Sequence, residues 1–299
     1  MSCAASRTAR NRGTMSMKPQ VILPQTKTQG FRDPCAVFKD GVCHVYYTLV
    51  CEDNGKQAFT LAESTSRDLV HFSAPRTLLP TDPRLNYSSP GNVFEHDGEY
   101  WICFQTYPRP DGETYGNRDS RLFLMHSRDL ETWSEPELIR VKGDVPFDDM
   151  GRMIAPYILP EDDGSFLCFF KQNGVSISRS RDLKHWDFLG HTACGENVCV
   201  LRSGAWYAIL HSPENGVGLL LTKDLMEFID CGVSMLGCES ELWAKDRVTA
   251  GFAVEREDET ILFFHGDNED VYVFGASLAL IRHFDLLKAF PRAAEVLKS

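Results

Sequence analysis

Two acidic residues stand at similar places in the sequence, each just ahead of a short apolar run. Asp33 precedes the run in "FRDPCAVF", and Glu196 precedes the run in "GENVCVL". If both runs reach one pocket, the two carboxylates are suited to general acid–base chemistry. Glycoside hydrolysis needs such a pair: one group protonates the leaving oxygen, and the other activates water or acts as the nucleophile. A wide separation leaves room for the water and predicts inversion.

A phrase that the chain repeats indicates which elements position these acids. The phrase reads "SRDLVHF", "SRDLETW" and "SRDLKHW", then more weakly "TKDLMEF" and "LALIRHF", and the copies begin at Ser66, Ser127, Ser180, Thr222 and Leu278. Copies lie roughly fifty residues apart, a period typical of propellers and solenoids. Because its Asp can hydrogen-bond the backbone two residues on, the phrase is predicted to hold a turn and to have no catalytic role.

The stretches between the copies indicate which repeat fold this is. Two apolar runs precede each copy, and turn sequences such as "KDG", "EHDG" and "EDDG" separate them. Asp and Gly favour the positive φ of tight hairpins. A third run leads into the phrase and a fourth follows it. Four short strands in each of five units, without a prominent amphipathic helix, predict an all-β chain: a five-bladed β-propeller with antiparallel blades around a central funnel.

Aligning the units on their first hairpin predicts which residue of each innermost strand faces the funnel mouth. In the first four units it is Asp33, Ser89, Ala155 and Glu196, and in the fifth, near "VTAGFAV", it is ambiguous. We therefore expect Asp33 and Glu196 on roughly opposite sides of the funnel, which favours the inverting arrangement. The alternative is that Asp33 caps a turn before a proline and Glu196 is simply exposed.

On these motifs the chain resembles glycoside hydrolase family 43 and its five-bladed relatives, a group of β-xylosidases, α-arabinofuranosidases and arabinanases. The likeness covers about residues 28–285 and rests on "RDP" opening blade one, the "SRDLxxW" turns and the Glu opening blade four. The resemblance implies an inverting enzyme in which Asp33 is the general base and Glu196 the general acid.

The resemblance also implies a third acid, an Asp opening blade three, that orients the general acid and tunes its pKa. The chain departs from this pattern, because its motif reads "IAP" with Ala155 in that place. Asp148 or Asp149, in "PFDDMGRMIAP", is a candidate substitute, since a nearby like charge would raise the pKa of Glu196. The alternative is that both residues are loop surface.

Seven further residues are candidates for substrate binding: Arg32, Arg152, Lys171, Ser89, His265, Glu241 and Trp243. Lys171 ends an apolar run and is expected to face a polar pocket. His265 lies where some relatives hold a central His, with a buried core His as the alternative. Glu241, in "CESELW", is similar to the acid of the related invertase family, but too few residues precede "FRDP" for that family's extra blade.

Three functions fit these residues. The first is an exo-acting, inverting glycoside hydrolase for small plant-type oligosaccharides of the β-xyloside or α-L-arabinofuranoside class. The second is a five-bladed glycoside phosphorylase, in which Arg32, Arg152 and Lys171 would bind phosphate and a single acid would suffice. The third is a non-catalytic carbohydrate-binding propeller, which the Ala155 departure favours.

Composition narrows the partners. The 299 residues carry a net charge of -11, which disfavours nucleic-acid binding and contact with an anionic membrane surface. No apolar run approaches the length of a transmembrane helix. We expect a small carbohydrate as the partner, no nucleic acid or membrane, no cofactor, and no metal, since no residue spacing specifies one.

The ten cysteines and the N-terminus bear on location and domain limits. The cysteines follow no CxxC pattern and mostly lie in strand-like runs, which indicates buried thiols in a reducing compartment and predicts a cytoplasmic protein. Residues 1–20 contain no apolar segment and are predicted to be a disordered leader. Residues 21–299 are predicted to form one catalytic propeller domain.

Overall fold

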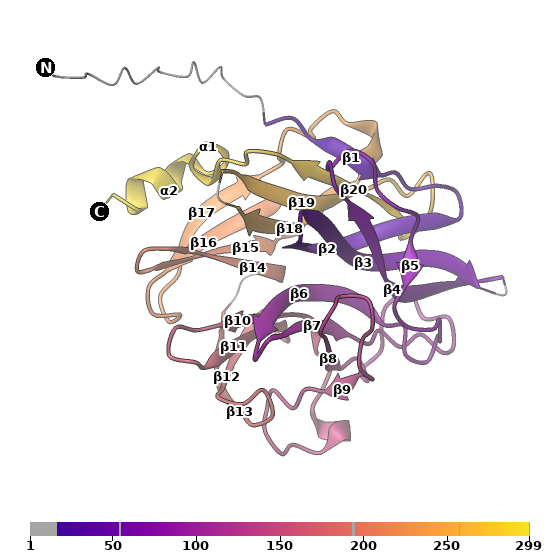
Figure 1. Cartoon of the computed structure of the whole chain (residues 1–299), viewed down its shortest axis with the longest axis horizontal. Helices are drawn as coiled ribbons and strands as arrows, with labels where there is room; N and C mark the ends of the chain where they lie inside the picture. Colours follow the sequence, from indigo (N-terminus) through magenta and orange to yellow (C-terminus); the bar gives the residue numbers. More distant parts are fainter. Residues whose placement is uncertain (1–16, 54, 193–194, 257, 299) are drawn as a thin grey trace, which may run out of the picture.

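The computed structural model describes residues 17–53, 55–192, 195–256 and 258–298 and confirms the five-bladed β-propeller (Figure 1). The first three blades take their four strands in chain order. Blade one contains β2 (Gln29–Lys39), β3 (Val42–Asp53), β4 (Lys56–Ser66) and β5 (Arg76–Thr77). Blade two contains β6 (Ser88–His96), β7 (Glu99–Gln105), β8 (Leu122–Ser127) and β9 (Glu137–Leu138). Blade three contains β10 (Ile154–Pro160), β11 (Phe166–Lys171), β12 (Val175–Ser180) and β13 (Trp186–Thr192).

The last two blades complete the ring. Blade four contains β14 (Glu196–Ser203), β15 (Trp206–Ser212), β16 (Val217–Thr222) and β17 (Ile229–Ser234). Blade five contains β18 (Arg247–Glu255), β19 (Thr260–Asp267), β20 (Ala276–Ile281) and, from the other end of the chain, β1 (Gln20–Leu23). The innermost strands neighbour one another in the order β2, β6, β10, β14, β18 and back to β2.

The outer strand of blade five corrects the expectation that a fourth strand follows every copy of the phrase. β1 supplies it by pairing with β20, so that Gln20 lies opposite Leu280. Two short helices follow the fifth copy instead, α1 (Leu286–Ala289) and α2 (Pro291–Val296). Asp285 caps α1 by accepting from two backbone N–H groups, and Pro291 opens α2, which are helix-start signals. The ring is thus closed by joining the two ends of the chain.

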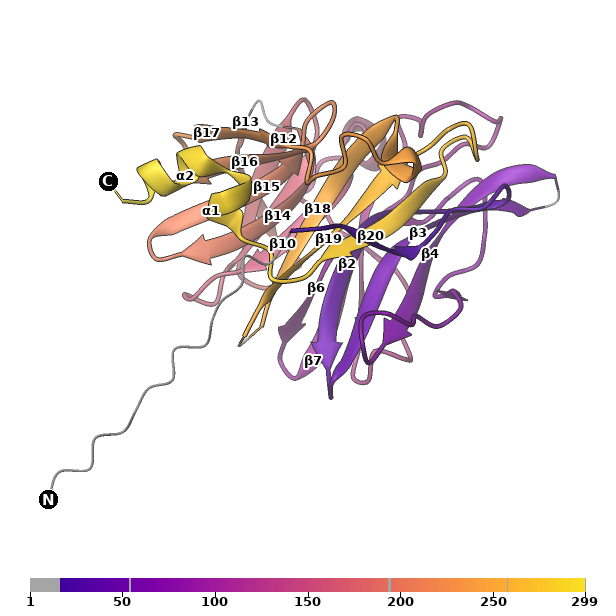
Figure 2. The ribbon, with the colours of Figure 1, turned by 90° about the horizontal axis from the view of Figure 1, so that it is seen from above.

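The two C-terminal helices lie at the rim of the propeller (Figures 1 and 2). In both views α1 and α2 are at the periphery, and α2 packs beside β17 (Figures 1 and 2). No helix among the described residues is both long and apolar enough to cross a membrane. The predicted leader, residues 1–20, overlaps the fold at its end because β1 begins at Gln20; residues 1–16 lie outside the described part of the chain.

Central strands of the blades are buried on both faces because each blade packs between two neighbours. This explains why runs such as "FLCFF" in β11 and "VGLLLT" in β16 are almost continuously apolar instead of alternating. Of the eight cysteines in the described ranges, seven are buried and none is disulfide-bonded. Burial raises the pKa of Cys43 to about 12, so these thiols pack as small apolar side chains.

The repeated phrase forms the turn between the third and fourth strands in blades one to four, as predicted. In each turn the Asp side chain accepts two backbone N–H groups at 2.8–3.0 Å, and the four residues are Asp68, Asp129, Asp182 and Asp224. The Leu after each Asp has a left-handed φ of 61–68°. Trp133, the aromatic of the second copy, packs edge-on against Tyr46 of blade one. The phrase is therefore scaffold that joins neighbouring blades.

Candidate active site

Each innermost strand contains a β-bulge near the funnel, where two or three of its residues face a single residue of the next strand. One residue in every bulge has a left-handed φ between 43° and 55°, and the five are Asp33, Ser89, Ala155, Asn197 and Ala250. Bulges re-aim side chains and are common beside active sites. The five blades therefore present one structurally equivalent position each.

Glu196 does not occupy the equivalent position that the hairpin alignment predicted for it. Asn197 does, and Glu196 precedes it, as Arg32 precedes Asp33 in blade one. The bulge of blade two contains one more residue than that of blade one, so counting back from a hairpin leaves an uncertainty of one residue. Glu196 nevertheless lines the same cavity as Asp33.

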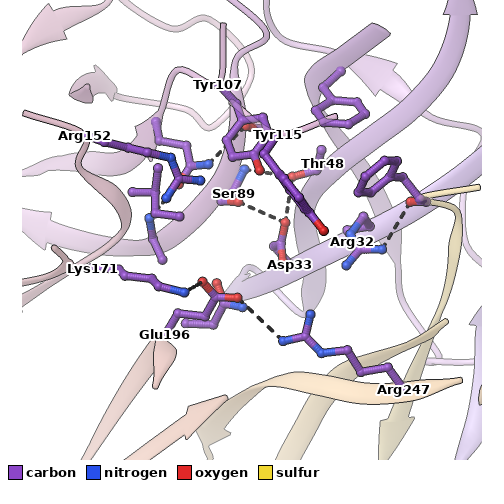
Figure 3. A pocket seen from close by; sticks show the side chains of 17 residues that line it. Arg32, Asp33, Thr48, Ser89, Tyr107, Tyr115, Arg152, Lys171, Glu196 and Arg247 are labelled. Atoms are coloured by element: carbon purple, nitrogen blue, oxygen red, sulfur yellow. Dashed lines mark hydrogen bonds and ion pairs between the residues drawn. The ribbon is translucent and has the colours of Figure 1, made fainter. Parts of the chain in front are cut away.

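This cavity has a volume of about 230 Å³, below the roughly 300–1,000 Å³ typical of sites for drug-sized ligands. Its charged lining comprises four cations and two acids: Arg32, Arg152, Lys171, Arg247, Asp33 and Glu196. Four aromatic side chains also line it: Phe59, Tyr107, Tyr115 and Phe274. Figure 3 shows Asp33 and Glu196 pointing into the cavity from different blades. The size and the polar lining suit a small hydrophilic ligand.

Two hydroxyl groups fix the carboxylate of Asp33. Ser89 Oγ donates to Asp33 Oδ2 at 2.9 Å, and Thr48 Oγ1 donates to the same oxygen at 3.2 Å. Thr48 Oγ1 in turn accepts the backbone N–H of Ser89 at 2.7 Å. The carboxylate is thus oriented by blades one and two, and Oδ1 accepts no hydrogen bond from either hydroxyl.

His265 lies beneath Asp33, fully buried in β19. Its Nδ1 accepts the backbone N–H of Asp33 at 3.0 Å, so the ring proton is on Nε2, which lies 3.4 Å from Asp267 Oδ1. Burial, with Arg32 and Arg247 nearby, holds the pKa of His265 well below its usual value. His265 is therefore neutral and supports the bulge. It does not line the cavity, whereas the sequence predicts that it contacts substrate.

Two cations hold Glu196. Lys171 Nζ lies 2.5 Å from Glu196 Oε2, and Arg247 Nη2 lies 3.5 Å from Oε1. Burial alone raises the pKa of Glu196, but Lys171 and Arg247 outweigh that effect and leave it below the usual value. In the ligand-free protein Glu196 is therefore ionised, the reverse of what a neighbouring third acid would produce.

The two arginines predicted to bind substrate lie in different surroundings. Arg32 donates through Nη1 to Asp267 Oδ1 at 3.3 Å and to the carbonyl of Phe274 at 3.2 Å. Arg152 donates through Nε to the carbonyl of Gly116 at 3.0 Å, and its guanidinium lies 5.4 Å from the ring centre of Tyr107. No carboxylate within the described ranges forms an ion pair with Arg152.

Four predicted residues lie away from the cavity. Asp148 and Asp149 are exposed in a short 3₁₀ helix (Phe147–Asp149), and the cations Lys171 and Arg247, not these acids, set the direction of the Glu196 pKa shift. Asp149 borders a neighbouring depression, which shares Arg152 and Lys171 with the cavity. Trp243 Nε1 donates to Glu241 Oε2 at 3.2 Å, and Trp243 packs on Phe264. The structure therefore does not bring these four residues to Asp33 and Glu196.

Sequence reasoning missed several residues of the site. Thr48 donates a hydrogen bond to Asp33, Arg247 forms an ion pair with Glu196, and Gln105 accepts the backbone N–H of Ala155 at 2.5 Å. Gln105 and Asp267 each end an apolar strand with a polar side chain. The same signal identified Lys171, so it could have found them too. Among the described residues, no three His, Cys, Asp or Glu side chains form a cluster able to hold a metal ion.

No protein-family model and no curated protein sequence matches this chain. Solved structures of glycoside hydrolases do share its fold. The GH43_1 enzyme from Xanthomonas citri, solved in complex with xylose, matches with a TM-score of 0.63 at 12% identity, covering 88% of this chain and 89% of its own. An exo-1,5-α-L-arabinanase from a bovine ruminal metagenomic library matches at 0.60 and 16%, covering 87% and 96%. The RS223 β-xylosidase matches at 0.62 and 14%, covering 89% and 94%.

Proposed function

We propose that this chain is a glycoside hydrolase in which Asp33 is the general base and Glu196 the general acid. The observation that carries the proposal is the arrangement in Figure 3: two carboxylates from separate blades face one small cavity, and one of them is fixed by two hydroxyl donors. The shared fold of the arabinanase and the β-xylosidase supports the same conclusion.

The reaction uses one water and two proton transfers. Asp33 removes a proton from the water, whose oxygen bonds to the anomeric carbon while the bond from that carbon to the leaving oxygen breaks. Glu196 gives its proton to the leaving oxygen. With a water between base and sugar, the configuration is inverted. Thr48 and Ser89 orient the carboxylate of Asp33 through their hydrogen bonds, which positions it to accept that proton.

This mechanism requires that Glu196 carry a proton when the substrate is bound. A general acid must be protonated when the bond breaks, whereas Lys171 and Arg247 hold Glu196 ionised in the free protein. The bound substrate must therefore change the surroundings of Glu196. The same ion pairs favour a second candidate, a carbohydrate-binding propeller without catalysis, in which Glu196 only accepts hydrogen bonds from the sugar.

For the substrate, we take as the starting point the β-xyloside or α-L-arabinofuranoside class that the family resemblance implies. The small volume of the cavity suits a terminal sugar better than an internal one, which favours exo action on short oligosaccharides. The charges that line the cavity bear further on the class of sugar.

The test is turnover of aryl glycosides by the wild type, Asp33→Asn and Glu196→Gln, each checked for folding by circular dichroism. The panel holds aryl β-xyloside, α-L-arabinofuranoside, α-L-arabinopyranoside, β-galactoside, β-glucuronide and β-galacturonide. Turnover that both variants lose, with an inverted product in a proton NMR time course, supports the proposal. A folded wild type that turns over none of them but binds a sugar would instead establish the carbohydrate-binding function.

A further inference from the structure

The cavity is cationic although the protein is acidic. Its lining has four Arg or Lys side chains against two carboxylates, while the whole chain has a net charge of -11. Two of the cations, Arg152 and Lys171, come from blade three, where the bulge position is held by Ala155 and contributes no charge. Figure 3 shows both side chains entering the cavity from the same side. We call Arg152 and Lys171 the blade-three cations.

Of the four cations, Arg152 is the most available, because Lys171 is already paired with Glu196. Arg32 is occupied by Asp267 and a backbone carbonyl. Arg247 lies 3.5 Å from Glu196 and belongs to blade five. Arg152 uses Nε for the Gly116 carbonyl and has no ion-pair partner among the described residues. An arginine without a carboxylate partner that lines a cavity can bind an oxyanion there, and its planar fork matches a carboxylate.

We propose that the blade-three cations bind an oxyanion, the carboxylate of a uronic acid, so that the substrate is a uronide instead of a neutral pentoside. This inference rests on the proposed function, because it names the substrate class of the same site. Arg152 supplies the fork and Lys171 a point charge, and the acidic remainder of the protein disfavours other anionic contacts. The aromatic side chains of the cavity are left to contact the apolar faces of the sugar.

The position of Lys171 links recognition of the carboxylate to the chemistry. Lys171 Nζ holds Glu196 at 2.5 Å, and a carboxylate between Arg152 and Lys171 competes with Glu196 for that ammonium group. The charged groups around Glu196 are Lys171 from β11, Arg247 from β18 and, at longer range, Arg32 from β2. Once Lys171 turns to the substrate, one of the two close cations is lost to Glu196, which favours its protonated form. Binding of an acidic sugar thereby favours the protonated Glu196 that cleaves the glycosidic bond of that sugar.

Free phosphate is the other source of an oxyanion, and the geometry disfavours it. A phosphate that replaced water would attack from the side of the general base, Asp33, opposite the leaving group. Lys171 instead contacts Glu196, the group assigned to the leaving oxygen. The carboxylate of Asp33, held in place by Thr48 and Ser89, would also repel phosphate on the attacking side. An anion at the blade-three cations is therefore part of the sugar.

The experiment uses pairs of aryl glycosides that differ in one carboxylate: β-D-glucuronide against β-D-xyloside, and β-D-galacturonide against α-L-arabinopyranoside. We expect at least one uronide to exceed its neutral partner about tenfold or more in kcat/KM. In Arg152→Gln that ratio falls by about 10–100-fold, as expected for the loss of a charge-assisted hydrogen bond. Arg152→Lys restores part of it. The matched control Arg128→Gln, on the exposed rim, leaves the ratio unchanged.

Three outcomes overturn the inference. Neutral glycosides could be turned over better than uronides, in which case the hydrolase proposal stands and the substrate class is wrong. Arg152→Gln could lower both members of a pair equally, which would make Arg152 a structural residue. Turnover could require added inorganic phosphate, which would identify free phosphate as the anion.

Calorimetric titration separates this inference from the proposed function. D-glucuronate or D-galacturonate should bind the wild type at least tenfold more tightly than D-xylose, and Arg152→Gln should remove the difference. If this holds while no glycoside is hydrolysed, the hydrolase proposal fails and the uronate site stands. Equal affinity for acidic and neutral sugars overturns the uronate site.

Discussion

The turns at the outer part of the blades and the bulges at the funnel both repeat one backbone conformation from blade to blade. The turns keep the same residue in that conformation, whereas the bulges do not. In the turns the same residue recurs, because Asp68, Asp129 and Asp182 each bond two N–H groups of their own turn. In the bulges the backbone recurs with a left-handed φ, whereas the side chain changes from Asp33 to Ala155 from blade to blade.

The difference teaches where chemistry can be placed in a repeat fold. A turn Asp is needed locally, so replacing it costs stability wherever it occurs. A bulge residue aims its side chain at the funnel and bonds little of its own backbone, so each blade can supply a different group. Blades one and two use this freedom for a fixed carboxylate and its hydroxyl donor, and blade three leaves the acid out and lines the cavity with cations.

The largest expected effect is that of the same substitution made in both regions. Asp33→Asn should lower kcat/KM about a thousandfold, because the amide cannot take the proton of water, and should leave the unfolding temperature nearly unchanged. Asp129→Asn, the matched change in a turn, should leave kcat/KM as in the wild type. Steady-state kinetics and thermal unfolding of both variants check this. A similar loss of activity in both would erase the distinction between bulge and turn.

The second effect concerns the acid next to the bulge of blade four. Glu196→Gln should lower kcat/KM about a hundredfold for a glycoside with a poor leaving group, because no proton reaches the leaving oxygen. The loss should be far smaller for a dinitrophenyl glycoside, which leaves without protonation. Glu241→Gln, outside the cavity, is the control. Equal losses for both leaving groups would argue against Glu196 as the acid.

The propeller could be predicted because the same phrase recurs about every fifty residues, at the turns, and because each unit contains apolar runs of strand length. The closing strand β1 could not be predicted from that repeat. It is four residues long, precedes the first unit and carries no phrase. Its place follows from closure of the ring, which depends on the two ends of the chain meeting in space and on nothing local in "QVIL".

The site was predicted in part. Asp33, Lys171 and Arg152 stand out in the sequence and do line one cavity. The hairpin alignment placed Glu196 at the bulge position that Asn197 occupies, because the number of residues in a bulge cannot be derived from the hydrophobic pattern. The partners of the acids, Thr48 and Arg247, lie on strands of blades one and five, and their contacts depend on how the blades are brought together. Neither residue belongs to a motif that a repeat alignment would mark.

The third effect tests the ion pair between blades three and four, measured on a neutral aryl glycoside. Lys171 lowers the pKa of Glu196. Activity that needs the protonated acid is therefore lost as the pH rises through this lowered pKa. Lys171→Met should raise that pKa and move the alkaline limb of the kcat/KM profile about one pH unit upward, since Arg247 remains. Lys184→Met, in an exposed turn, is the control. An unchanged limb would remove Lys171 from the control of Glu196.

The smallest effect returns to the turns. Asp182 accepts the backbone N–H groups of Lys184 and His185 at 2.9 and 2.8 Å, and His185 Nδ1 lies 2.7 Å from its other oxygen. Asp182→Ala should lower the unfolding temperature by about 2–4 °C and leave kcat/KM unchanged, since the turn is remote from the cavity.

The bond from His185, with the two backbone bonds, holds the pKa of Asp182 below its usual value. Its contribution is therefore present above the unfolded pKa, near 4, and is lost as the pH falls, so the gap between the two proteins should narrow in acid. A gap that widens in acid, or a loss of activity at neutral pH, would show that the turn does more than hold the blade.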